Sequence, residues 1–200
     1  MYSLNYLVYL KNLMRLVNTV LPILQSRREV MRVFICGFSG SGKSTLGSRL
    51  AKSSDFQVLD LDEEIYERMG AGYDSLSDYI EDIGIDEFRK DEQEMIKLLH
   101  GNFKDDYVII LGGGSLESTL VVDFIKSVEA RVVFLDTPFD ECYSRLKKDG
   151  NRPLMKKGRD FMKAKFDERA SLYEGISSLK LSPEQSDEIS SLSDLIGLLK

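Results

Sequence analysis

A glycine-rich segment, residues 37–45, limits the possible folds of this chain more than any other feature. It reads Gly-Phe-Ser-Gly-Ser-Gly-Lys-Ser-Thr and matches the pattern G-x-x-x-x-G-K-[ST]. The segment directly follows a short apolar run from Arg32 to Cys36, and a helical pattern begins after it at Ser44. A strand, a glycine-rich loop and a helix in this order are the context that the motif requires. The sequence therefore predicts a phosphate-binding P-loop rather than a chance glycine-rich turn.

The chemistry expected of this loop follows from its backbone and two side chains. Its glycines allow successive N–H groups to curl around phosphate oxygens, and the positive end of the following helix faces the same point. Lys43 is expected to reach the β and γ phosphates of a nucleotide, and Ser44 to bind Mg²⁺. The loop alone does not distinguish a kinase from a GTPase or a motor protein. The residues predicted to hold the nucleotide are Gly37, Ser39, Gly40, Ser41, Gly42, Lys43, Ser44 and Thr45.

Short apolar runs alternate with helical patterns from Met31 onward, which is typical of a parallel sheet with crossover helices. The apolar runs lie at Arg32 to Cys36, Gln57 to Asp60, Tyr107 to Leu111 and Arg131 to Leu135. They lack polar alternation, as expected of strands that are buried on both faces. The helical patterns lie at about 44–53, 61–69, 75–83, 86–100, 117–128, 139–148 and 182–200. The sequence predicts one α/β domain over residues 31–200, with a mobile basic flap over about 151–165.

Two carboxylates lie at the end of the second predicted strand. Asp60 and Asp62 are separated by one residue, so their side chains point the same way in an extended segment. Ligands of a parallel sheet bind at the carboxyl ends of its strands. We therefore expect one carboxylate beside a metal ion and the other beside an acceptor hydroxyl. Asp62 has a second interpretation, because aspartate is a favoured N-cap and a helix is predicted from Glu63.

The third predicted strand ends in three glycines, Gly112, Gly113 and Gly114. Without side chains, this segment lets a small substrate or a phosphate approach the backbone closely. The fourth predicted strand ends in Asp136-Thr137-Pro138. We interpret that tripeptide as a helix cap with proline in the first turn, rather than as a metal site.

Together these motifs resemble the shikimate kinase family over nearly all of the chain from Met31 to about Tyr173. The motifs, in the family's order after the P-loop, are Leu59-Asp60-Leu61-Asp62-Glu63-Glu64-Ile65, Phe88-Arg89-Lys90-Asp91-Glu92, Gly112-Gly113-Gly114, Leu135-Asp136-Thr137-Pro138-Phe139, Asn151-Arg152-Pro153-Leu154, and Arg169 ahead of Leu172-Tyr173. The resemblance implies a three-layer P-loop fold of the nucleoside-monophosphate-kinase type. It also implies five parallel strands in the order 2-3-1-4-5, a substrate-binding helical segment and a lid. The implied reaction is transfer of the γ-phosphoryl group of ATP to the 3-hydroxyl of shikimate.

The resemblance implies roles for individual residues. Asp60 resembles the aspartate near Mg²⁺, and Asp62 resembles the one that hydrogen-bonds the acceptor hydroxyl and takes its proton. Arg89 and Arg169 resemble the arginines that hold the carboxylate of shikimate, which suits the planar guanidinium group. Taken alone, Arg89 also fits a solvated i,i+4 ion pair on an acidic helix, and Arg169 fits a surface charge.

Further roles complete the site that the resemblance implies. Glu92 resembles a glutamate near the substrate hydroxyls or near these arginines, and the three glycines resemble the substrate-facing loop. Arg152 resembles the lid arginine that closes over the phosphates and neutralises charge in the transition state, although alone it also fits a surface charge. Catalytic roles are thus expected for Lys43, Asp62 and Arg152.

The chain departs from the family's pattern at three places. The segment from Asp62 to Arg89 is a few residues longer than the usual spacing, which makes the placing of Arg89 less certain than that of Lys43. Ser171 stands where the family usually has proline, and the lid is short and basic.

The first thirty residues fall outside the resemblance and are predicted to form an amphipathic helical extension. Its apolar residues recur at helical spacing before Pro22: Leu4, Leu7, Val8, Leu10, Leu13, Met14, Val17, Val20 and Leu21. We expect this helix to pack on its own domain or on a partner chain. A membrane-surface helix or transit segment, and an extension upstream of a natural start at Met31, are the alternatives. A secretory signal is excluded because the basic residues follow the first apolar run.

Composition excludes several classes of protein. A net charge of −6 provides no overall field that attracts nucleic acid, and no run of 18 apolar residues is present that would insert stably in a membrane. Cys36 and Cys142 are expected as free thiols in a reducing, cytoplasmic compartment. His100 is expected to cap a helix C-terminus without a catalytic role. We expect a monomer, with association through the N-terminal helix as an open alternative.

Two other functions stay open on the sequence. Kinases of the gluconate or adenylylsulfate type share a similar phosphate loop, but are not expected to combine it with Phe88-Arg89-x-x-Glu92, three glycines and the segment from Arg169 to Tyr173. A nucleotide-binding interaction protein without turnover would use the N-terminal helix for docking. Every expected catalytic position is present, which favours an enzyme.

Overall fold

The computed structural model describes residues 13–15, 30–52, 57–149 and 157–199. The chain divides into two units, Met1–Val30 and Met31–Lys200. Of the predicted N-terminal helix only residues 13–15 are described, and these are helical. The rest of that prediction lies outside the described residues, and every element named below belongs to the second unit.

Five parallel strands form one sheet in the order β2-β3-β1-β4-β5, which confirms the predicted fold class. The strands are β1 (Arg32–Cys36), β2 (Gln57–Asp60), β3 (Tyr107–Ile110), β4 (Arg131–Leu135) and β5 (Leu179–Leu181). The central strand β1 pairs with β3 on one side and with β4 on the other. Because all strands are parallel, the loops that follow β1, β2 and β3 meet at one edge of the sheet.

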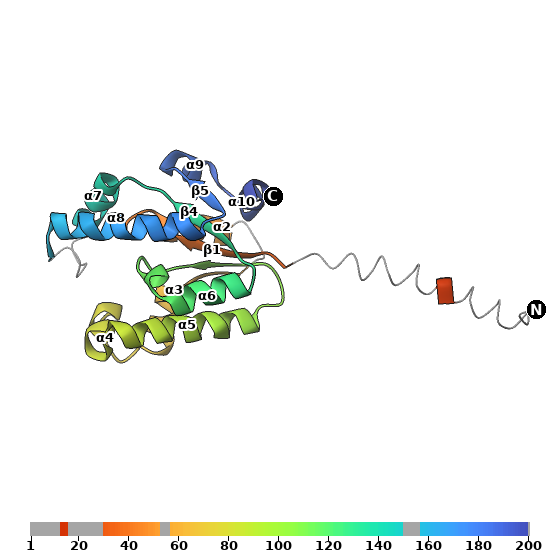
Figure 1. Ribbon diagram of the computed structural model, residues 1–200, viewed down its shortest axis with the longest axis horizontal. Helices are drawn as coiled ribbons and strands as arrows, with labels where there is room; N and C mark the ends of the chain where they lie inside the picture. Colours follow the sequence, from red (N-terminus) through yellow and green to blue (C-terminus); the bar gives the residue numbers. More distant parts are fainter. Residues whose placement is uncertain (1–12, 16–29, 53–56, 150–156, 200) are drawn as a thin grey trace, which may run out of the picture. The chain divides into compact units, whose positions relative to one another are not determined.

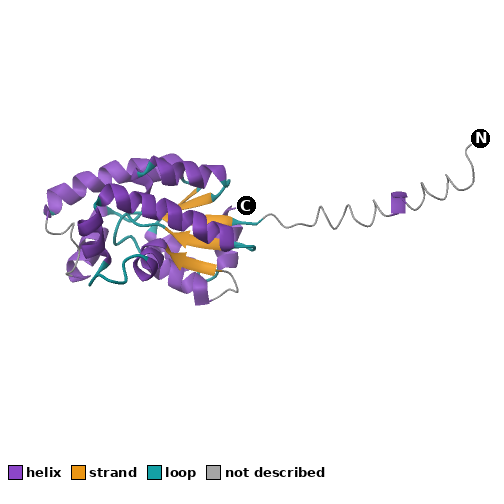
Figure 2. Ribbon diagram, turned by 90° about the horizontal axis from the view of Figure 1, so that it is seen from below, coloured by secondary structure: helices purple, strands orange, loops and turns teal. Residues whose placement is uncertain are grey.

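Helices cover both faces of the sheet (Figures 1 and 2). The two apolar cores contain alternate residues of β1, with Phe34 and Cys36 in one core and Val33 and Ile35 in the other. The helices of the first core are α3 (Leu61–Arg68), α4 (Leu76–Ile83), α5 (Ile85–Asn102), α6 (Thr119–Ser127), α7 (Phe139–Asp149) and α8 (Arg159–Ile176), with the short 3₁₀ helix η1 (Ser115–Glu117). The second core contains residues of α2 (Lys43–Lys52) and α10 (Leu192–Leu199), and α9 (Pro183–Glu188) precedes α10. Burial on both faces explains the uninterrupted apolar runs of β1, β3 and β4.

The structure corrects two predicted segments at the C-terminal end. The single helix expected over 182–200 is two helices, because the chain turns between α9 and α10. There the Asp194 carboxylate accepts hydrogen bonds from the backbone N–H groups of Ser190 and Ser191, at 3.1 and 2.9 Å. Residues 159–165 of the expected flap form the first turns of α8, while residues 151–156 lie outside the described part.

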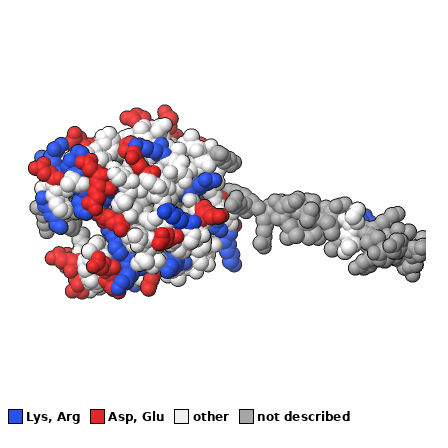
Figure 3. Space-filling model, viewed as in Figure 1, with Lys and Arg blue, Asp and Glu red and all other residues white. Residues whose placement is uncertain are grey.

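The surface charges, the helices and the two cysteines can be compared with what composition predicted. On the face drawn in Figure 3, acidic and basic side chains of the described residues are interspersed rather than separated into a broad basic area. Within the described ranges, no helix combines the length and apolarity needed to span a bilayer. Cys36 and Cys142 are free thiols, as predicted, and both are buried.

Candidate active site

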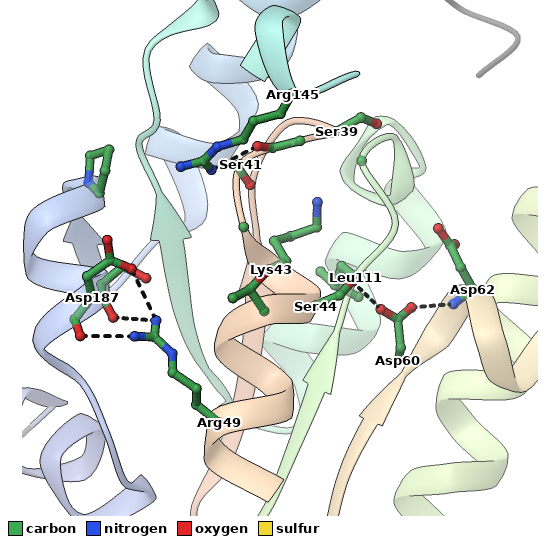
Figure 4. Close-up of a pocket in the computed structure, with 16 residues that line it drawn as sticks. Ser39, Ser41, Lys43, Ser44, Arg49, Asp60, Asp62, Leu111, Arg145 and Asp187 are labelled. Carbon is green, nitrogen blue, oxygen red and sulfur yellow. Dashed lines mark hydrogen bonds and ion pairs between the residues drawn. The ribbon is translucent and has the colours of Figure 1, made fainter. Parts of the chain in front are cut away.

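A pocket of about 470 Å³ lies at the carboxyl ends of β1, β2 and β3 (Figure 4). Ten of the residues that line it were predicted from the sequence: Ser39, Gly40, Ser41, Gly42, Lys43, Ser44, Thr45, Asp60, Asp62 and Gly113. The other six are Leu111, Arg49, Arg145, Pro183, Ser186 and Asp187. The P-loop and the two predicted carboxylates therefore share one cavity.

The P-loop presents donors that its own backbone satisfies only in part. Gly40 and Gly42 adopt φ angles of 83° and 99°, which side chains rarely allow. Lys43 is 9% exposed, and its Nζ donates to the carbonyl oxygens of Gly37 and Phe38 at 2.8 and 3.2 Å. Burial lowers the pKa of Lys43, although the charges of Asp62 and Asp60 oppose this. The hydroxyl of Ser41 is buried without a hydrogen-bond partner among the described residues. The loop thus has polar atoms available for an anion.

Asp60 links the P-loop to the start of α3. Its Oδ2 accepts a hydrogen bond from the Ser44 hydroxyl at 3.0 Å, and its Oδ1 accepts from the backbone N–H of Asp62 at 3.1 Å. Asp60 is therefore the N-cap of α3, so the alternative interpretation of Asp62 as the cap is wrong. The Ser44 hydroxyl and the Asp60 carboxylate are oxygen ligands of the kind that Mg²⁺ prefers.

Asp62 is a partly buried carboxylate on the side of the pocket away from Arg49 (Figure 4). Burial, followed by the nearby charges of Asp60 and Glu92, raises its pKa to about 6, against the opposing effects of Lys43 and Arg89. A Cβ atom at Gly112 would lie 2.6 Å from Oδ1 of Asp62, so a larger residue there would displace the carboxylate. A carboxylate with a pKa near neutrality can accept a proton at physiological pH.

Arg89 of α5 and Arg169 of α8 lie together beyond this carboxylate. Nη2 of Arg89 donates to Glu117 Oε2 at 3.1 Å, and Nε and Nη2 of Arg169 donate to the two oxygens of Glu117 at 3.1 and 3.0 Å. A Cβ atom at Gly114 would lie 2.9 Å from Nη2 of Arg169 and still nearer Nη2 of Arg89. The side chains of Arg89 and Arg169 are only 15% and 9% exposed. The alternatives of a solvated pair and a surface charge are therefore wrong, and these two residues are called the arginine pair below.

Glu92 lies behind the arginine pair rather than in the pocket. Its side chain is fully buried, and it accepts hydrogen bonds from the Ser115 hydroxyl and from Nη1 of Arg89, the latter at 2.6 Å. Burial raises the pKa of Glu92, and the charge of Arg89 opposes this. Of the two positions that the resemblance allowed, the structure places Glu92 beside the arginines.

Several residues at the site had no signal in the sequence. Glu117 lies on a helix of three residues, too short for a periodic pattern. Arg145 of α7 donates to the carbonyl oxygen of Gly40 at 3.1 Å, and Arg49 of α2 donates to the carbonyl oxygens of Asp187 and Ser186 at 2.9 and 2.7 Å. Tertiary folding alone brings these residues to the site.

Three other predicted residues either do not line the pocket or are not described. Arg152 is outside the described residues. Gly37 contributes its carbonyl to Lys43 but does not line the pocket. His100 does not end its helix, because α5 continues to Asn102, and its Nδ1 lies 2.8 Å from the Tyr107 hydroxyl, away from the site.

The site combines a P-loop after β1, two carboxylates at the end of β2 and two guanidinium groups beyond a glycine loop. This combination defines a P-loop kinase that acts on a small anionic acceptor. The family model for shikimate kinase matches residues 39–199. The shikimate kinase of Aquifex aeolicus is 38% identical over 143 residues, which cover 72% of this chain and 82% of that protein. The shikimate kinase of Persephonella marina is 30% identical over 84% of this chain and 98% of that protein. The chain belongs to the shikimate kinase family.

Solved structures agree with this assignment. The crystal structure of the Aquifex aeolicus shikimate kinase has a TM-score of 0.63 and 35% identity, with 84% of this chain and 97% of that chain covered. The structure of the Acinetobacter baumannii shikimate kinase in complex with shikimate has a TM-score of 0.67 and 25% identity, with 78% of this chain and 86% of that chain covered. The resemblance stated from the sequence is confirmed.

Proposed function

We propose that this chain transfers the γ-phosphoryl group of ATP to the 3-hydroxyl of shikimate, and so forms shikimate 3-phosphate in the chorismate pathway to aromatic amino acids. The observation that supports this most is the position of the glycine loop after β3. Its three consecutive residues lie against the three parts of the site: Gly112 against Asp62, Gly113 against Ser39 of the P-loop, and Gly114 against the arginine pair. A carboxylate held by the arginines and a triphosphate held by the P-loop would thus meet at Asp62.

In this proposal the P-loop holds the phosphates of ATP through its backbone N–H groups, with Lys43 on the β and γ phosphates. The hydroxyl of Ser41, which lacks a partner among the described residues, gains one in a bound phosphate. The nucleoside occupies the side of the pocket away from Asp62, where Arg145 and Asp187 lie (Figure 4).

The oxygen atoms of Ser44 and Asp60 would hold Mg²⁺, which when bound neutralises phosphate charge. The phosphates and water would complete its coordination, because the described residues contain no group of three acidic, histidine or cysteine side chains placed to hold a metal. Ser44 and Asp60 already lie within 3.0 Å of one another, so little rearrangement is needed.

The proposed reaction needs a base and charge stabilisation. The acceptor oxygen attacks the γ phosphorus, its proton passes to the Asp62 carboxylate, and the bond between that phosphorus and the bridging oxygen of ADP breaks. Lys43 stabilises the negative charge that moves onto the phosphate oxygens. Arg152 of the lid is proposed to neutralise further charge in the transition state. This role is inferred only from the family motif Asn-Arg-Pro-Leu.

The arginine pair is proposed to hold the carboxylate of shikimate, with Glu92 holding Arg89 in place. Two largely buried guanidinium groups on different helices suit one planar carboxylate, because each offers several N–H donors in a fixed plane. The two free thiols support the further proposal of a cytoplasmic location. Residues 1–30 are proposed as a separate extension of a monomeric kinase domain over 31–200.

The test is an ADP-release assay with shikimate, gluconate and adenylylsulfate as parallel acceptors. We expect release of ADP with shikimate, a large loss in Lys43→Met, and formation of shikimate 3-phosphate by mass spectrometry. Preference for gluconate or adenylylsulfate would replace the proposed acceptor. Binding of ATP without ADP release for any acceptor would instead indicate a nucleotide-binding protein that lacks turnover.

A further inference from the structure

The arginine pair is already occupied by a carboxylate of the chain itself. Glu117 accepts three hydrogen bonds from the pair, one from Arg89 and two in parallel from Arg169. The parallel bonds give the bidentate geometry that an external carboxylate would also adopt. A Cβ atom at Gly114 would lie 2.9 Å from Oε2 of Glu117 and at the same distance from Nη2 of Arg169, so these groups converge on one point of the backbone.

The charges around the arginine pair show why its occupancy by Glu117 matters for binding of the acceptor. Among the groups in hydrogen-bond contact here, the three positive charges of Arg89, Arg169 and Lys165 are balanced by the three negative charges of Glu92, Glu117 and Glu168. An acceptor carboxylate would therefore enter a neutral site and would lie next to two carboxylates in a partly buried place. Repulsion between these carboxylates opposes binding of the acceptor unless one of the two glutamates on the arginines, Glu92 or Glu117, moves away.

The two glutamates differ in their freedom to leave. Glu92 is fully buried and accepts from Ser115 as well as from Arg89, so moving it would strand a charge in the core. The Glu117 side chain is 24% exposed and lies at the surface end of the site. Nζ of Lys165 lies 3.5 Å from Oε1 of Glu117, and the Lys165 side chain is 32% exposed. Lys165 can thus keep Glu117 paired when its carboxylate turns outward.

We infer that Glu117 is a specificity-determining residue that occupies the arginine pair in the absence of substrate and must be displaced by the acceptor carboxylate. Glu117 thereby sets the affinity for the acceptor and selects acceptors whose carboxylate pairs with both arginines well enough to displace it. This inference rests on the proposed function, because it takes the acceptor's carboxylate from there. Hydrogen bonds and charges from Arg169, Arg89 and Lys165 lower the pKa of Glu117 despite its burial, which agrees with a carboxylate that is ionised in this position.

The test measures binding of shikimate and of its methyl ester to the full chain by calorimetry. In Glu117→Gln the competing charge is gone, and we expect shikimate to bind about tenfold more tightly, corresponding to about one charged hydrogen bond. The ester has no charge to compete with Glu117, so its affinity should stay unchanged. In kinetics, KM for shikimate should fall while KM for ATP does not change.

Glu168→Gln is the matched control. This substitution also removes one negative charge beside Lys165, because Glu168 of α8 pairs with Lys165 at 2.7 Å. Unlike Glu117, Glu168 does not contact the arginine pair. The affinity of this variant for shikimate should equal that of the parent chain. Equal tightening in both variants, or unchanged or weaker binding in Glu117→Gln, would overturn the inference, since Glu117 would then only support the arginines.

Two additions keep the test decisive. If Glu117→Gln does not fold, Glu117→Asp keeps the charge but shortens its reach across the pair, and about threefold tighter binding is expected; parent affinity would contradict the inference. If the parent chain does not use shikimate, the proposed function fails. The inference is then decided by cyclohexene-1-carboxylate, a ring carboxylate without hydroxyls. That anion should raise the melting temperature of Glu117→Gln more than that of Glu168→Gln, and equal shifts would reject the inference.

Discussion

The phosphate side of the site comes from nine consecutive residues, 37–45, whereas the acceptor side is assembled from α5, η1 and α8. On the phosphate side, Lys43 is held by backbone carbonyls and the Ser41 hydroxyl has no partner among the described residues. On the acceptor side, both arginines are paired with carboxylates of the chain. The phosphate side can therefore bind an anion directly, whereas the acceptor side must release a carboxylate of the chain before it binds the carboxylate of the acceptor.

This difference has a physical reason. A backbone loop offers neutral donors that bind phosphate without bringing a counter-charge into the protein. Two buried guanidinium groups close together repel one another and are expensive to bury without an anion. The acceptor side therefore needs internal carboxylates to fold, and these become competitors in the bound state.

The largest effect is expected where the two sides meet. Asp62→Asn removes the proposed base and should lower kcat by about 10²- to 10⁴-fold, measured by ADP release with saturating shikimate. The control is Asp136→Asn, an aspartate that follows β4 and pairs on the surface with Lys180 at 3.0 Å. Retention of activity within about threefold in Asp62→Asn would remove Asp62 from the mechanism and leave the two sides without a shared group.

The same substitution should stabilise the ligand-free chain in a pH-dependent way. Since the pKa of Asp62 is raised to about 6 from 3.8, the folded state binds a proton that the unfolded state releases, and stability falls as pH rises through this window. Relative to the parent, Asp62→Asn should gain up to about 3 kcal/mol between pH 4 and pH 7, from about 1.4 kcal/mol per pKa unit. Urea unfolding in the presence of a metal chelator measures this gain. A difference that does not vary with pH would show that the carboxylate carries no burial penalty.

A selective effect is expected from the acceptor side. Arg169→Ala should weaken shikimate by about 1.5 to 3 kcal/mol, or about 10- to 100-fold in KM, with little change for ATP. Lys163→Ala is the control on the same helix, because Lys163 makes an exposed ion pair with Asp167 and lies over the rings of Phe139 and Phe166, outside the arginine pair. Equal losses for both substrates would break the division into two sides. Arg89 is a poorer test, since its removal would strand the buried Glu92 and destabilise the fold.

The same difference explains how far the sequence predicted the site. Contiguous features were predicted well: the P-loop, Asp60 and Asp62 after β2, and the glycines after β3 all lie where strand ends must meet. Arg89 and Arg169 came only from the resemblance, because no local pattern distinguishes a buried arginine from a surface one. Glu117 was missed, since a pairing between η1 and two distant helices leaves no periodic trace.

The fold shows the same limit. The four strands predicted from apolar runs agree with the structure to within one residue, and burial on both faces of β1, β3 and β4 explains their clear pattern. The strand β5 has only three residues and gave no such pattern. The break between α9 and α10 depends on side-chain caps at Ser191 and Asp194, which a helical periodicity over the same residues conceals.

The smallest effects are expected from two buried serines, one on each side of the site. The Ser41 hydroxyl is buried without a partner among the described residues, whereas the Ser115 hydroxyl donates to the buried Glu92. Ser41→Ala should therefore stabilise the ligand-free chain by about 1 kcal/mol, because it removes an unsatisfied polar atom. Ser115→Ala should destabilise it by about 1 to 3 kcal/mol, because it removes a donor from a buried carboxylate.

Urea unfolding without nucleotide measures both changes in the free energy of unfolding. Changes of opposite sign would support a phosphate side with a free polar atom for its ligand and an acceptor side whose polar atoms are paired within the chain. With ATP bound, the gain in Ser41→Ala should shrink, since the parent hydroxyl then has a phosphate oxygen to bind. Destabilisation by both substitutions would mean that Ser41 is already satisfied in the empty loop, and the contrast between the two sides would be lost.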